Sequence, residues 1–501
     1  MSGIFILSII AIYFSVLLFI AYLTSKKNTD NDTFFRANRQ SPWGIVAIGM
    51  VGSSISGVSF VSVPGMVRSI DFSYMQTVFG FFIGYVVISF VLLPRYYKLN
   101  LTSIYSYLQQ RIGKHAYKTG AAFFLIAKTI GAAARLYVVT RILQTSVFDS
   151  WQVPYWITVC GTIFLIWLYT HRSGIKTIVW TDTLQAIIML VALVLMVVQV
   201  SEKLHFEYGT LFSNLWADSH SRIFVFDDWY SKQHFVKQFF SGVFIAIVMT
   251  GLDQDMMQKN LTCRSIGDAQ KNMLSYGFSF IPVNFLFLVL GFMLLSLANQ
   301  QHIDLPQSAD QILVLFATTY LGNAVLLIFI VGIIAAAFSS ADSALAALTT
   351  SFSIDIMGVE NESKLKATKI RKWIHIAFSL LFILIILLFG ALNNKSIIDT
   401  IYIIASYTYG PLLGMYAFGF FTKRITNDKA TPYIALSSPI ICYLLQVYST
   451  KYFSYSFGYE LLMLNGFLTF VGLWAFSYKK TNKAFNIETS LDSILTKKRN
   501  D

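Results

Sequence analysis

Residues 331–350 read VGIIAAAFSSADSALAALTT, a stretch apolar and long enough to cross a bilayer as a helix, yet it contains a carboxylic acid. Ser339, Ser340 and Ser343 recur at helical spacing and share one face, with Asp342 beside them. An ionisable group inside a membrane span is unfavourable without a partner, so it indicates a functional site. Hydroxyl and carbonyl oxygens suit a hard cation, and we expect this face to bind sodium. The alternative is that the serines are small packing residues bonded to their own helix.

The composition indicates a polytopic membrane protein. Of the 501 residues, 55% are hydrophobic and only 13% are charged, whereas about a quarter of a soluble chain is charged. Spans of suitable length are found at residues 4–23, 42–67, 75–94, 119–146, 153–170, 177–200, 238–256, 273–298, 322–351, 373–391, 397–421, 432–449 and 460–478. We therefore expect an all-α protein with about thirteen transmembrane helices, a transporter domain over 1–479 and a cytoplasmic tail over 480–501.

The distribution of basic residues predicts the orientation. Of the 38 Lys and Arg residues, 28 fall in alternate connections and the C-terminal tail, and 7 fall on the opposite side. The excess marks the cytoplasmic side, so we expect the N-terminus outside and the C-terminus inside the cell (inner or plasma) membrane. The net charge of +13 then reflects this bias, and no nucleic-acid partner is expected. The first span lacks a basic leader and a cleavage site, so we expect a retained helix.

The order of the spans predicts an inverted repeat. Without the extra N-terminal helix at 4–23 and the C-terminal helices at 432–478, ten spans form two sets of five, over 42–200 and 238–421. Five is odd, so the sets cross the membrane in opposite senses, and such repeats place their site where the first helix of each half is broken. Both first helices hold glycines and polar residues: Gly49, Gly52, Gly57, Pro64 and Gly65 in one, and Gly242, Gly251 and Asp253 in the other. The alternative is that the glycines only allow close packing.

Two further charged residues lie inside spans. Asp182 is a second carboxyl among hydroxyls, which favours a cation site shared with Asp342, although it could also sit at the headgroup level. Arg135 lies near the centre of span 119–146 among alanines. It either pairs with a buried carboxylate such as Asp253 or binds an anionic substrate with its bidentate fork. Lys128, nearer the end of that span, is expected to extend to the interface.

Several motifs together resemble the sodium/solute symporter family, which includes sodium-coupled glucose, proline, vitamin and sialic acid carriers. The resemblance covers nearly the whole chain and rests on residues 55–65, 181–185, 253–259 (DQDMMQK), 268–271 (DAQK), 336–343 and 409–414 (YGPLLG). It implies the leucine-transporter fold, with the five-plus-five inverted repeat, and Na+ as the coupling ion.

The resemblance also implies site residues. The sodium site would use the carbonyls of Gly52, Ile55 and Ala336 and the hydroxyls of Ser339 and Ser340. A second cation site would use Asp182, Ser339, Asp342 and Ser343. Substrate contacts would come from Ser54, Ser56, Ser59, Phe72, Gln76, Arg135 and Asp253. Relatives have serine at position 342, so Asp342 either tightens the second cation site or takes a proton instead.

These features favour a sodium-coupled symporter of a small polar solute in the lipid bilayer. Sugar carriers have amides at positions 59 and 253, which disfavours a neutral hexose, whereas the small hydroxyls with Phe72, Gln76 and Arg135 look more like the sialic acid carriers. A carboxylate or an acidic sugar such as sialic acid is therefore the first choice, and a neutral sugar or other organic solute is the alternative. A non-transporting solute sensor is disfavoured by a tail of about 23 residues, since such sensors append a signalling domain. An enzyme is not expected, because His171, His302 and His375 stand apart from any nucleophile or metal cluster.

Overall fold

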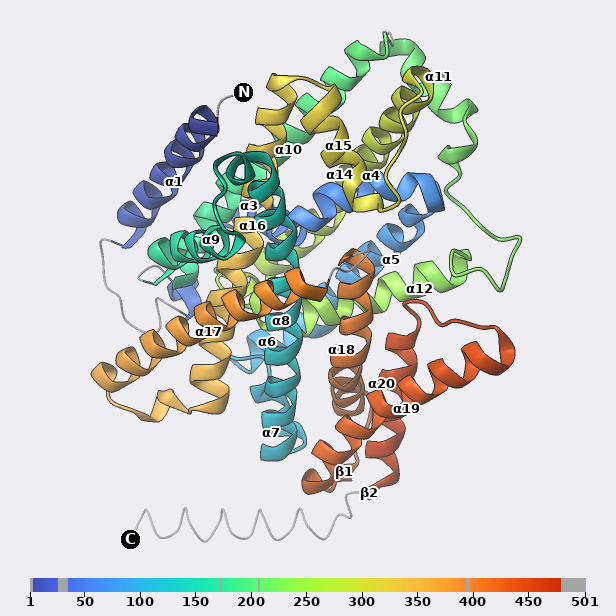
Figure 1. Cartoon of the computed structure of the whole chain (residues 1–501). Helices are drawn as coiled ribbons and strands as arrows, with labels where there is room; N and C mark the ends of the chain where they lie inside the picture. The colour runs from blue at the N-terminus through green and yellow to red at the C-terminus, as the bar shows by residue number, and fades with distance from the viewer. Residues whose placement is uncertain (1–2, 26–34, 172–173, 206–207, 393–396, 479–501) are drawn as a thin grey trace, which may run out of the picture.

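The computed structural model describes residues 3–25, 35–171, 174–205, 208–392 and 397–478, and it is a bundle of α-helices (Figure 1). The expected tail at 480–501 lies outside the described residues. The α-helices are α1 Gly3–Ser25, α3 Trp43–Ser54, α4 Gly57–Ile70, α5 Tyr74–Val87, α6 Leu93–Lys98, α7 Ser106–Arg111, α8 Lys114–Leu143, α9 Tyr155–Thr170, α10 Gly174–Lys203, α11 Tyr208–Ala217, α12 Phe235–Ala246, α13 Gln254–Asn260, α14 Ile266–Gln301, α15 Ile312–Leu315, α16 Asn323–Ser351, α17 Lys364–Leu392, α18 Ile397–Phe421, α19 Thr431–Phe453 and α20 Leu461–Ala475.

Shorter elements join or extend these helices. Five are π-helical: η2 Ile88–Leu92, η3 Gln144–Phe148, η6 Ile247–Gly251, η8 Phe316–Tyr320 and η9 Phe352–Ile356. Six are 3-10 turns: η1 Ala37–Arg39, η4 Asp149–Trp151, η5 Ser219–Ser221, η7 Ala309–Gln311, η10 Val359–Asn361 and η11 Asp428–Ala430. Two short strands, β1 Ile425–Thr426 and β2 Ser477–Tyr478, pair antiparallel.

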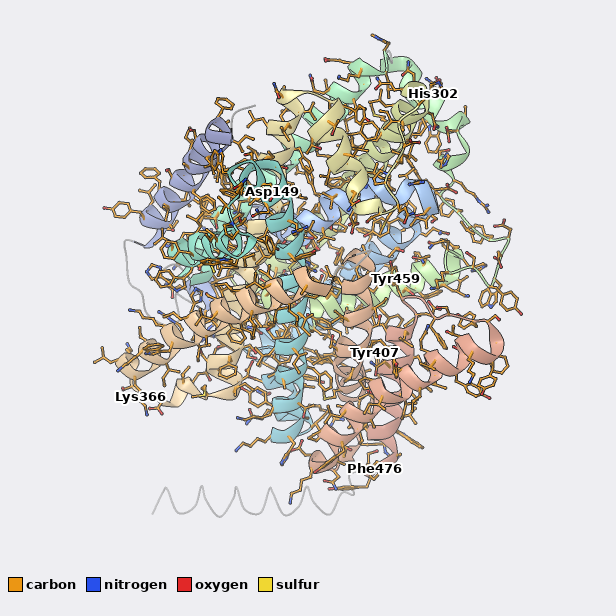
Figure 2. The ribbon with its side chains drawn as sticks, viewed as in Figure 1. Asp149, His302, Lys366, Tyr407, Tyr459 and Phe476 are labelled. Atoms are coloured by element: carbon orange, nitrogen blue, oxygen red, sulfur yellow. The ribbon has the colours of Figure 1, made fainter. Side chains whose placement is uncertain are left out.

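The helices confirm a multi-pass membrane protein. Among the described residues, eight helices are long and apolar enough to cross a bilayer, and two bent helix pairs pass the same test together. The outer surface is apolar: Leu380, Leu384 and Leu388 of α17 are all exposed and follow one helix face. Such a stripe suits contact with lipid. Figure 2 shows His302, which follows α14, and Phe476, which follows α20, at opposite ends of the molecule.

Both spans that we predicted to be broken are bent. Helices α3 and α4 meet at 62°, and the segment Phe235–Gly251 meets α13 at 70°. At the first bend Ile55 and Ser56 leave the helical region of backbone space. At the second bend Asp253 is extended and caps α13, where its carboxylate accepts the amide hydrogens of Asp255 and Met256.

Helices α3, α10 and α16 pack against one another, and small residues allow the approach. A Cβ atom at Gly49 would lie 3.2 Å from Cβ of Asp182, and one at Gly52 would lie 2.7 Å from Cβ of Ala186. Side chains at these two positions would hold α10 away from α3. The glycines therefore bring the carboxylate of Asp182 to the broken end of α3.

A prediction concerns the contact between α5 and α12. A Cβ atom at Gly242 would lie 2.2 Å from the backbone oxygen of Thr77, so the helices would have to separate. We expect Gly242→Ala to lower the free energy of unfolding by about 1–3 kcal/mol, as for overpacking elsewhere, measured by thermal unfolding in detergent. Gly161→Ala is the matched control, because a Cβ there meets no heavy atom within 4 Å. Equal unfolding midpoints for the two variants would contradict this account of the contact.

Candidate functional site

A buried carboxylate on α10 collects hydroxyls from two other helices. Asp182 Oδ1 accepts a hydrogen bond from Ser339 at 2.8 Å, and its Oδ2 accepts from Ser53 at 2.9 Å and from Ser343 at 3.0 Å. Asp182 and Ser339 have no solvent-exposed surface. The structure thus brings together three of the four residues expected at the second cation site, Asp182, Ser339 and Ser343, and adds Ser53.

The fourth residue, Asp342, bonds to Tyr169 of α9 and to a backbone amide. Its Oδ2 accepts a hydrogen bond from the hydroxyl of Tyr169 on α9 at 3.0 Å, and its Oδ1 accepts from the amide of Ser343 at 2.6 Å. Like Asp182, it is completely buried. Two carboxylates therefore lie in the same apolar region, each with hydroxyl donors.

Ser340 connects α16 to the bend between α3 and α4. Its hydroxyl lies 3.1 Å from the carbonyl oxygen of Ser53 and 3.2 Å from that of Ala336. The expected sodium ligands Gly52 and Ile55 flank this contact in the chain, and Ile55 is fully buried. The oxygens of Ser340, Ser53 and Ala336 therefore gather at the bend.

A lysine that follows the predicted span 238–256 lies inside this region. Lys259, on α13, is 1% exposed, and its ammonium nitrogen lies 2.7 Å from Asp182 Oδ2 and contacts the hydroxyl of Ser53. It also lies 3.7 Å from Asp255 Oδ1. The charge of Asp182 is thus already balanced by a side chain of the same protein.

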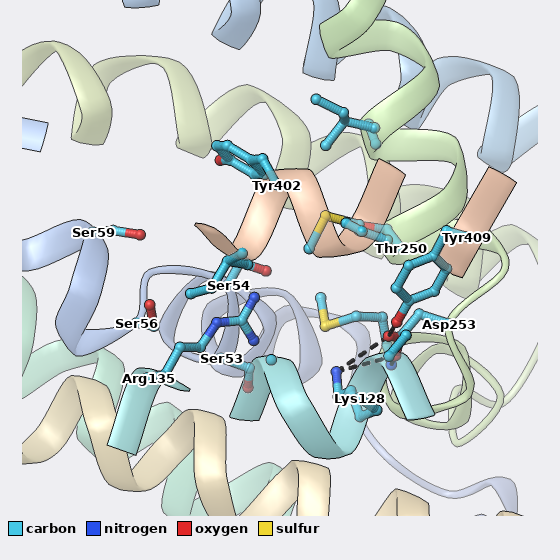
Figure 3. Close-up of a pocket in the computed structure, with 18 of the residues that line it drawn as sticks. Ser53, Ser54, Ser56, Ser59, Lys128, Arg135, Thr250, Asp253, Tyr402 and Tyr409 are labelled. Carbon is cyan, nitrogen blue, oxygen red and sulfur yellow. Dashed lines mark hydrogen bonds and ion pairs between the residues drawn. The ribbon is translucent and has the colours of Figure 1, made fainter. Parts of the chain in front are cut away.

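A cavity that is partly open to solvent lies beside the bend (Figure 3), and its outline encloses about 950 Å³, open solvent included. Its polar lining includes Ser53, Ser54, Ser56, Ser59, Lys128, Arg135, Thr250, Asp253, Tyr276, Tyr402 and Tyr409, and its apolar lining includes Phe81, Met249, Met256 and Phe280. Four broken or central helices, α3/α4, α8, α12/α13 and α18, provide most of these residues. An apolar wall with a few converging polar groups is typical of a small-molecule site.

One side of the cavity is a buried ion-pair network. The ammonium of Lys128 lies 3.2 Å from both Asp253 oxygens and 2.8 Å from Asp255 Oδ2 (Figure 3 shows the contacts with Asp253). The hydroxyl of Tyr409 donates to Asp253 Oδ2 at 2.6 Å. All four side chains are buried. The expectation that Lys128 reaches the membrane interface is therefore wrong: two carboxylates on the bent segment hold it in the interior.

Arg135 lies two turns further along α8, on the same side of the helix as Lys128. Figure 3 shows its guanidinium pointing into the cavity on the side of Ser54. Asp253, which we considered as its partner, pairs with Lys128 instead. Among the residues that the structure describes, no carboxylate forms an ion pair with Arg135. A fixed cation thus faces the cavity without a bound acid.

Of the expected substrate contacts, Ser54, Ser56, Ser59, Arg135 and Asp253 line the cavity. The hydroxyl of Ser54 also lies 2.7 Å from that of Tyr276 on α14.

The two other expected contacts, Phe72 and Gln76, lie outside this cavity. Phe72 packs edge-on against Phe285 at a ring separation of 5.9 Å. The amide of Gln76 donates to the carbonyl of Gln233 at 2.9 Å and accepts from the amide hydrogen of Val225. In this structure Gln76 thus holds the segment that precedes α12.

Sequence reasoning missed both buried lysines, although signals for them exist. Lys128 and Arg135 are seven residues apart, which places them on the same face of one helix. In the structure Lys128 is the one that pairs with buried acids. Asp255 and Lys259 are four residues apart, the spacing of an ion pair on one helix. These spacings indicate which charges share a helix face, but not which acid of one helix meets which base of the other.

Comparisons with known proteins show which sequences the chain is similar to. The sequence model of the sodium:solute symporter family matches residues 34–432. The chain is 22% identical over 467 residues to a sodium/sialic acid symporter, NanT, of Aliivibrio fischeri (strain ATCC 700601 / ES114), and the match covers 91% of each chain. It is 21% identical over 436 residues to the sodium/sialic acid symporter SiaT of Proteus mirabilis (strain HI4320), covering 85% of this chain and 86% of that one.

The fold is similar to that of a solved transporter. A substrate-bound, outward-open Na+-coupled sialic acid symporter superposes with a TM-score of 0.80 at 19% identity, covering 93% of this chain and 96% of that one. At this identity the likeness concerns the fold. It supports the helical transporter architecture that the spans and bends of this chain indicate.

Proposed function

Since the chain belongs to the sodium:solute symporter family, it is a transporter rather than an enzyme, with Na+ as the coupling ion, and we propose that its solute is a small carboxylate. An acidic sugar such as sialic acid is the first choice. The observation that carries this proposal is Arg135, whose guanidinium faces the cavity with no acid paired to it among the described residues. Arg135 is half-buried on a membrane-spanning helix, where a cation needs a counter-charge, and a substrate carboxylate supplies one in bidentate geometry.

The substrate site is proposed to be formed by Ser54, Ser56, Ser59, Arg135 and Asp253, which all line the cavity. The serine hydroxyls and the tyrosines of the lining suit the hydroxyl groups of a sugar acid. Two relatives are sodium/sialic acid symporters, which supports a carboxylate as the solute class. The pairing of Asp253 with Lys128 leaves Arg135 as the cation available to the substrate.

For sodium, we propose the carbonyls of Gly52, Ile55 and Ala336 with the hydroxyls of Ser339 and Ser340. The contact of Ser340 with the carbonyls of Ser53 and Ala336 supports this, because it gathers oxygens at the bend. An ion held there joins the α3/α4 bend to α16 and thereby favours the arrangement that completes the substrate cavity.

A second cation site is proposed at Asp182, Ser339, Asp342 and Ser343. The hydroxyls of Ser339 and Ser343 on the Asp182 carboxylate support it. Asp342 takes either a cation or a proton in this site, and its partners in the structure are the hydroxyl of Tyr169 and a backbone amide.

The architecture belongs to the same proposal. Thirteen helices, with halves over 42–200 and 238–421 in inverted orientation, place the extracellular N-terminus and the cytoplasmic C-terminus on opposite sides. The bends of 62° and 70° in the first helix of each half support this assignment.

Ser340→Ala tests the sodium site. We expect the sodium concentration that gives half-maximal uptake in proteoliposomes to rise about tenfold, because one of five ligands is lost and a lost hydrogen bond to a charged group amounts to roughly 1–3 kcal/mol. Ser296→Ala is the matched control, since that serine also bonds a carbonyl one turn earlier in its helix but lies on α14. Unchanged half-saturation in Ser340→Ala would remove this serine from the sodium site.

The solute itself is tested by a thermal-shift screen of the purified protein. Sialic acid, other sugar acids, monocarboxylates, amino acids and neutral hexoses are compared in sodium and in potassium at equal ionic strength. We expect stabilisation by compounds with a carboxylate, in sodium only. Stabilisation by a neutral hexose, with no response to any carboxylate, would overturn the proposed substrate class.

A further inference from the structure

The ammonium of Lys259 pairs with Asp182, one of the residues of the proposed second cation site. It lies 2.7 Å from Asp182 Oδ2 and contacts the hydroxyl of Ser53, which itself donates to Asp182. These are oxygen ligands of the kind that bind sodium. The lysine carries one positive charge, as sodium does, so the two cations compete for the same carboxylate.

A second carboxylate, that of Asp255, lies close to the same ammonium. Asp255 Oδ1 is buried, has no hydrogen-bond partner within the described part of the chain, and lies 3.7 Å from the Lys259 nitrogen. Asp255 lies one turn before Lys259 on the same helix, α13. Rotation of the lysine side chain therefore carries the ammonium from Asp182 toward Asp255 without any movement of the helices.

We propose that Lys259 is a resident cation of the second site, which it occupies while sodium is absent and leaves for Asp255 when sodium binds Asp182. The proposal rests on the second cation site given above. It explains why Asp255 Oδ1, although buried, has no hydrogen-bond donor among the described residues. Asp255 keeps the ammonium buried and paired in both positions, which satisfies the requirement that a buried charge has a partner.

The exchange also connects the cation site to the substrate cavity. Asp255 Oδ2 already binds the ammonium of Lys128 at 2.8 Å, and Lys128 also binds Asp253 in the cavity wall. When Lys259 arrives, two ammonium groups share one carboxylate, and repulsion between them favours a shift of Lys128 toward Asp253. Sodium at Asp182 thus alters the charge beside the substrate through three side chains in series.

The test is a sodium titration of the purified full-length protein in nanodiscs, with choline replacing sodium, read by tryptophan fluorescence and by thermal stability. In Lys259→Met the competitor is gone, so we expect the half-saturating sodium concentration to fall at least tenfold. We also expect this variant to be much less stable in choline, because Asp182 then lacks a counter-ion. The double variant Asp182→Asn/Lys259→Met should regain stability in choline.

Asp255→Asn should shift the half-saturating sodium concentration in the opposite direction. The displaced ammonium then has no carboxylate of its own to reach, so we expect the half-saturating sodium concentration to rise at least fivefold. Lys237→Met is the control for loss of a buried lysine, since Lys237, on α12, is buried and its ammonium lies over the ring of Tyr455. The sodium response of this variant should match that of the wild type. A purely structural ion pair predicts no fall in Lys259→Met and no rise in Asp255→Asn.

The outcomes separate this inference from the proposed function. If the wild-type protein responds to sodium while Lys259→Met and Asp255→Asn titrate as it does, the resident-cation role is overturned and the sodium-coupled function remains. If Lys259→Met does not fold in either salt, an unchanged titration of Asp255→Asn overturns the inference by itself. If the wild-type protein does not respond to sodium, the proposed cation sites fail, and the inference fails with them.

Discussion

Replacing Lys128 by methionine is expected to lower the free energy of unfolding by about 3 to 5 kcal/mol, the usual effect of removing one partner of a buried ion pair. Methionine retains the length of the side chain and removes only the ammonium. Asp253 would keep the hydrogen bond from Tyr409, but Asp255 would lose its closest cation. The measurement is chemical or thermal unfolding of the purified protein in detergent, with helical circular dichroism as the signal.

Two further variants make this expectation specific. Lys118→Met, on the same helix, removes an exposed ammonium whose hydrogen bond goes to a backbone carbonyl, and it should change stability by less than about 1 kcal/mol. Lys128→Met/Asp253→Asn removes one charge of each sign and should recover part of the loss. If Lys128→Met is as stable as Lys118→Met, the lysine does not neutralise the two acids.

Arg135→Lys is expected to weaken binding of a carboxylate solute at least tenfold, about 1.4 kcal/mol. Lysine keeps the positive charge but lacks the planar fork that binds both carboxylate oxygens. Affinity is measured by calorimetric titration in sodium with the best carboxylate from the thermal-shift screen and with its neutral amide. The amide should bind the wild type and the variant equally, because its interaction does not depend on the fork.

The control for this variant is Arg141→Lys. Arg141 lies on the same helix but is exposed and stacks over the ring of Tyr155. Its replacement should leave solute affinity unchanged. If Arg135→Lys binds the carboxylate as tightly as the wild type does, or if the solute is neutral, the anionic-substrate proposal is lost.

The presence of long apolar helices and the places of the two bends followed from the sequence because both are local properties. A run of about twenty apolar residues is long enough to cross the bilayer wherever it packs. Glycines and polar residues concentrated in residues 49–65 weaken a helix at that point, and the bend at Ile55 and Ser56 occurs there. The serines of α16 were likewise readable from their spacing, since helical periodicity alone puts them on one face.

The pairing of Lys128 with Asp253 and of Lys259 with Asp182 is different, because each of these pairs joins residues from separate helices. Lys128 and Asp253 are 125 positions apart, and spacing within one helix says nothing about which acid a lysine meets across a bundle. From the sequence, Lys128 near a span end was as compatible with the membrane interface as with the interior. The bend before α13 places Lys128 in the interior, since it turns Asp253 and Asp255 toward α8.

By itself, the sequence determined the membrane class, the long apolar helices, the weak points of the two that bend and the hydroxyl face of α16, since these depend on local composition and periodicity. Only the tertiary structure decided that Lys259 pairs with Asp182, that Lys128 pairs with Asp253, and that Arg135 faces the cavity. The physical reason is that partners of a buried charge are selected by where helices cross, and here the crossing of α10 over α3 depends on two glycines whose missing side chains permit the contact.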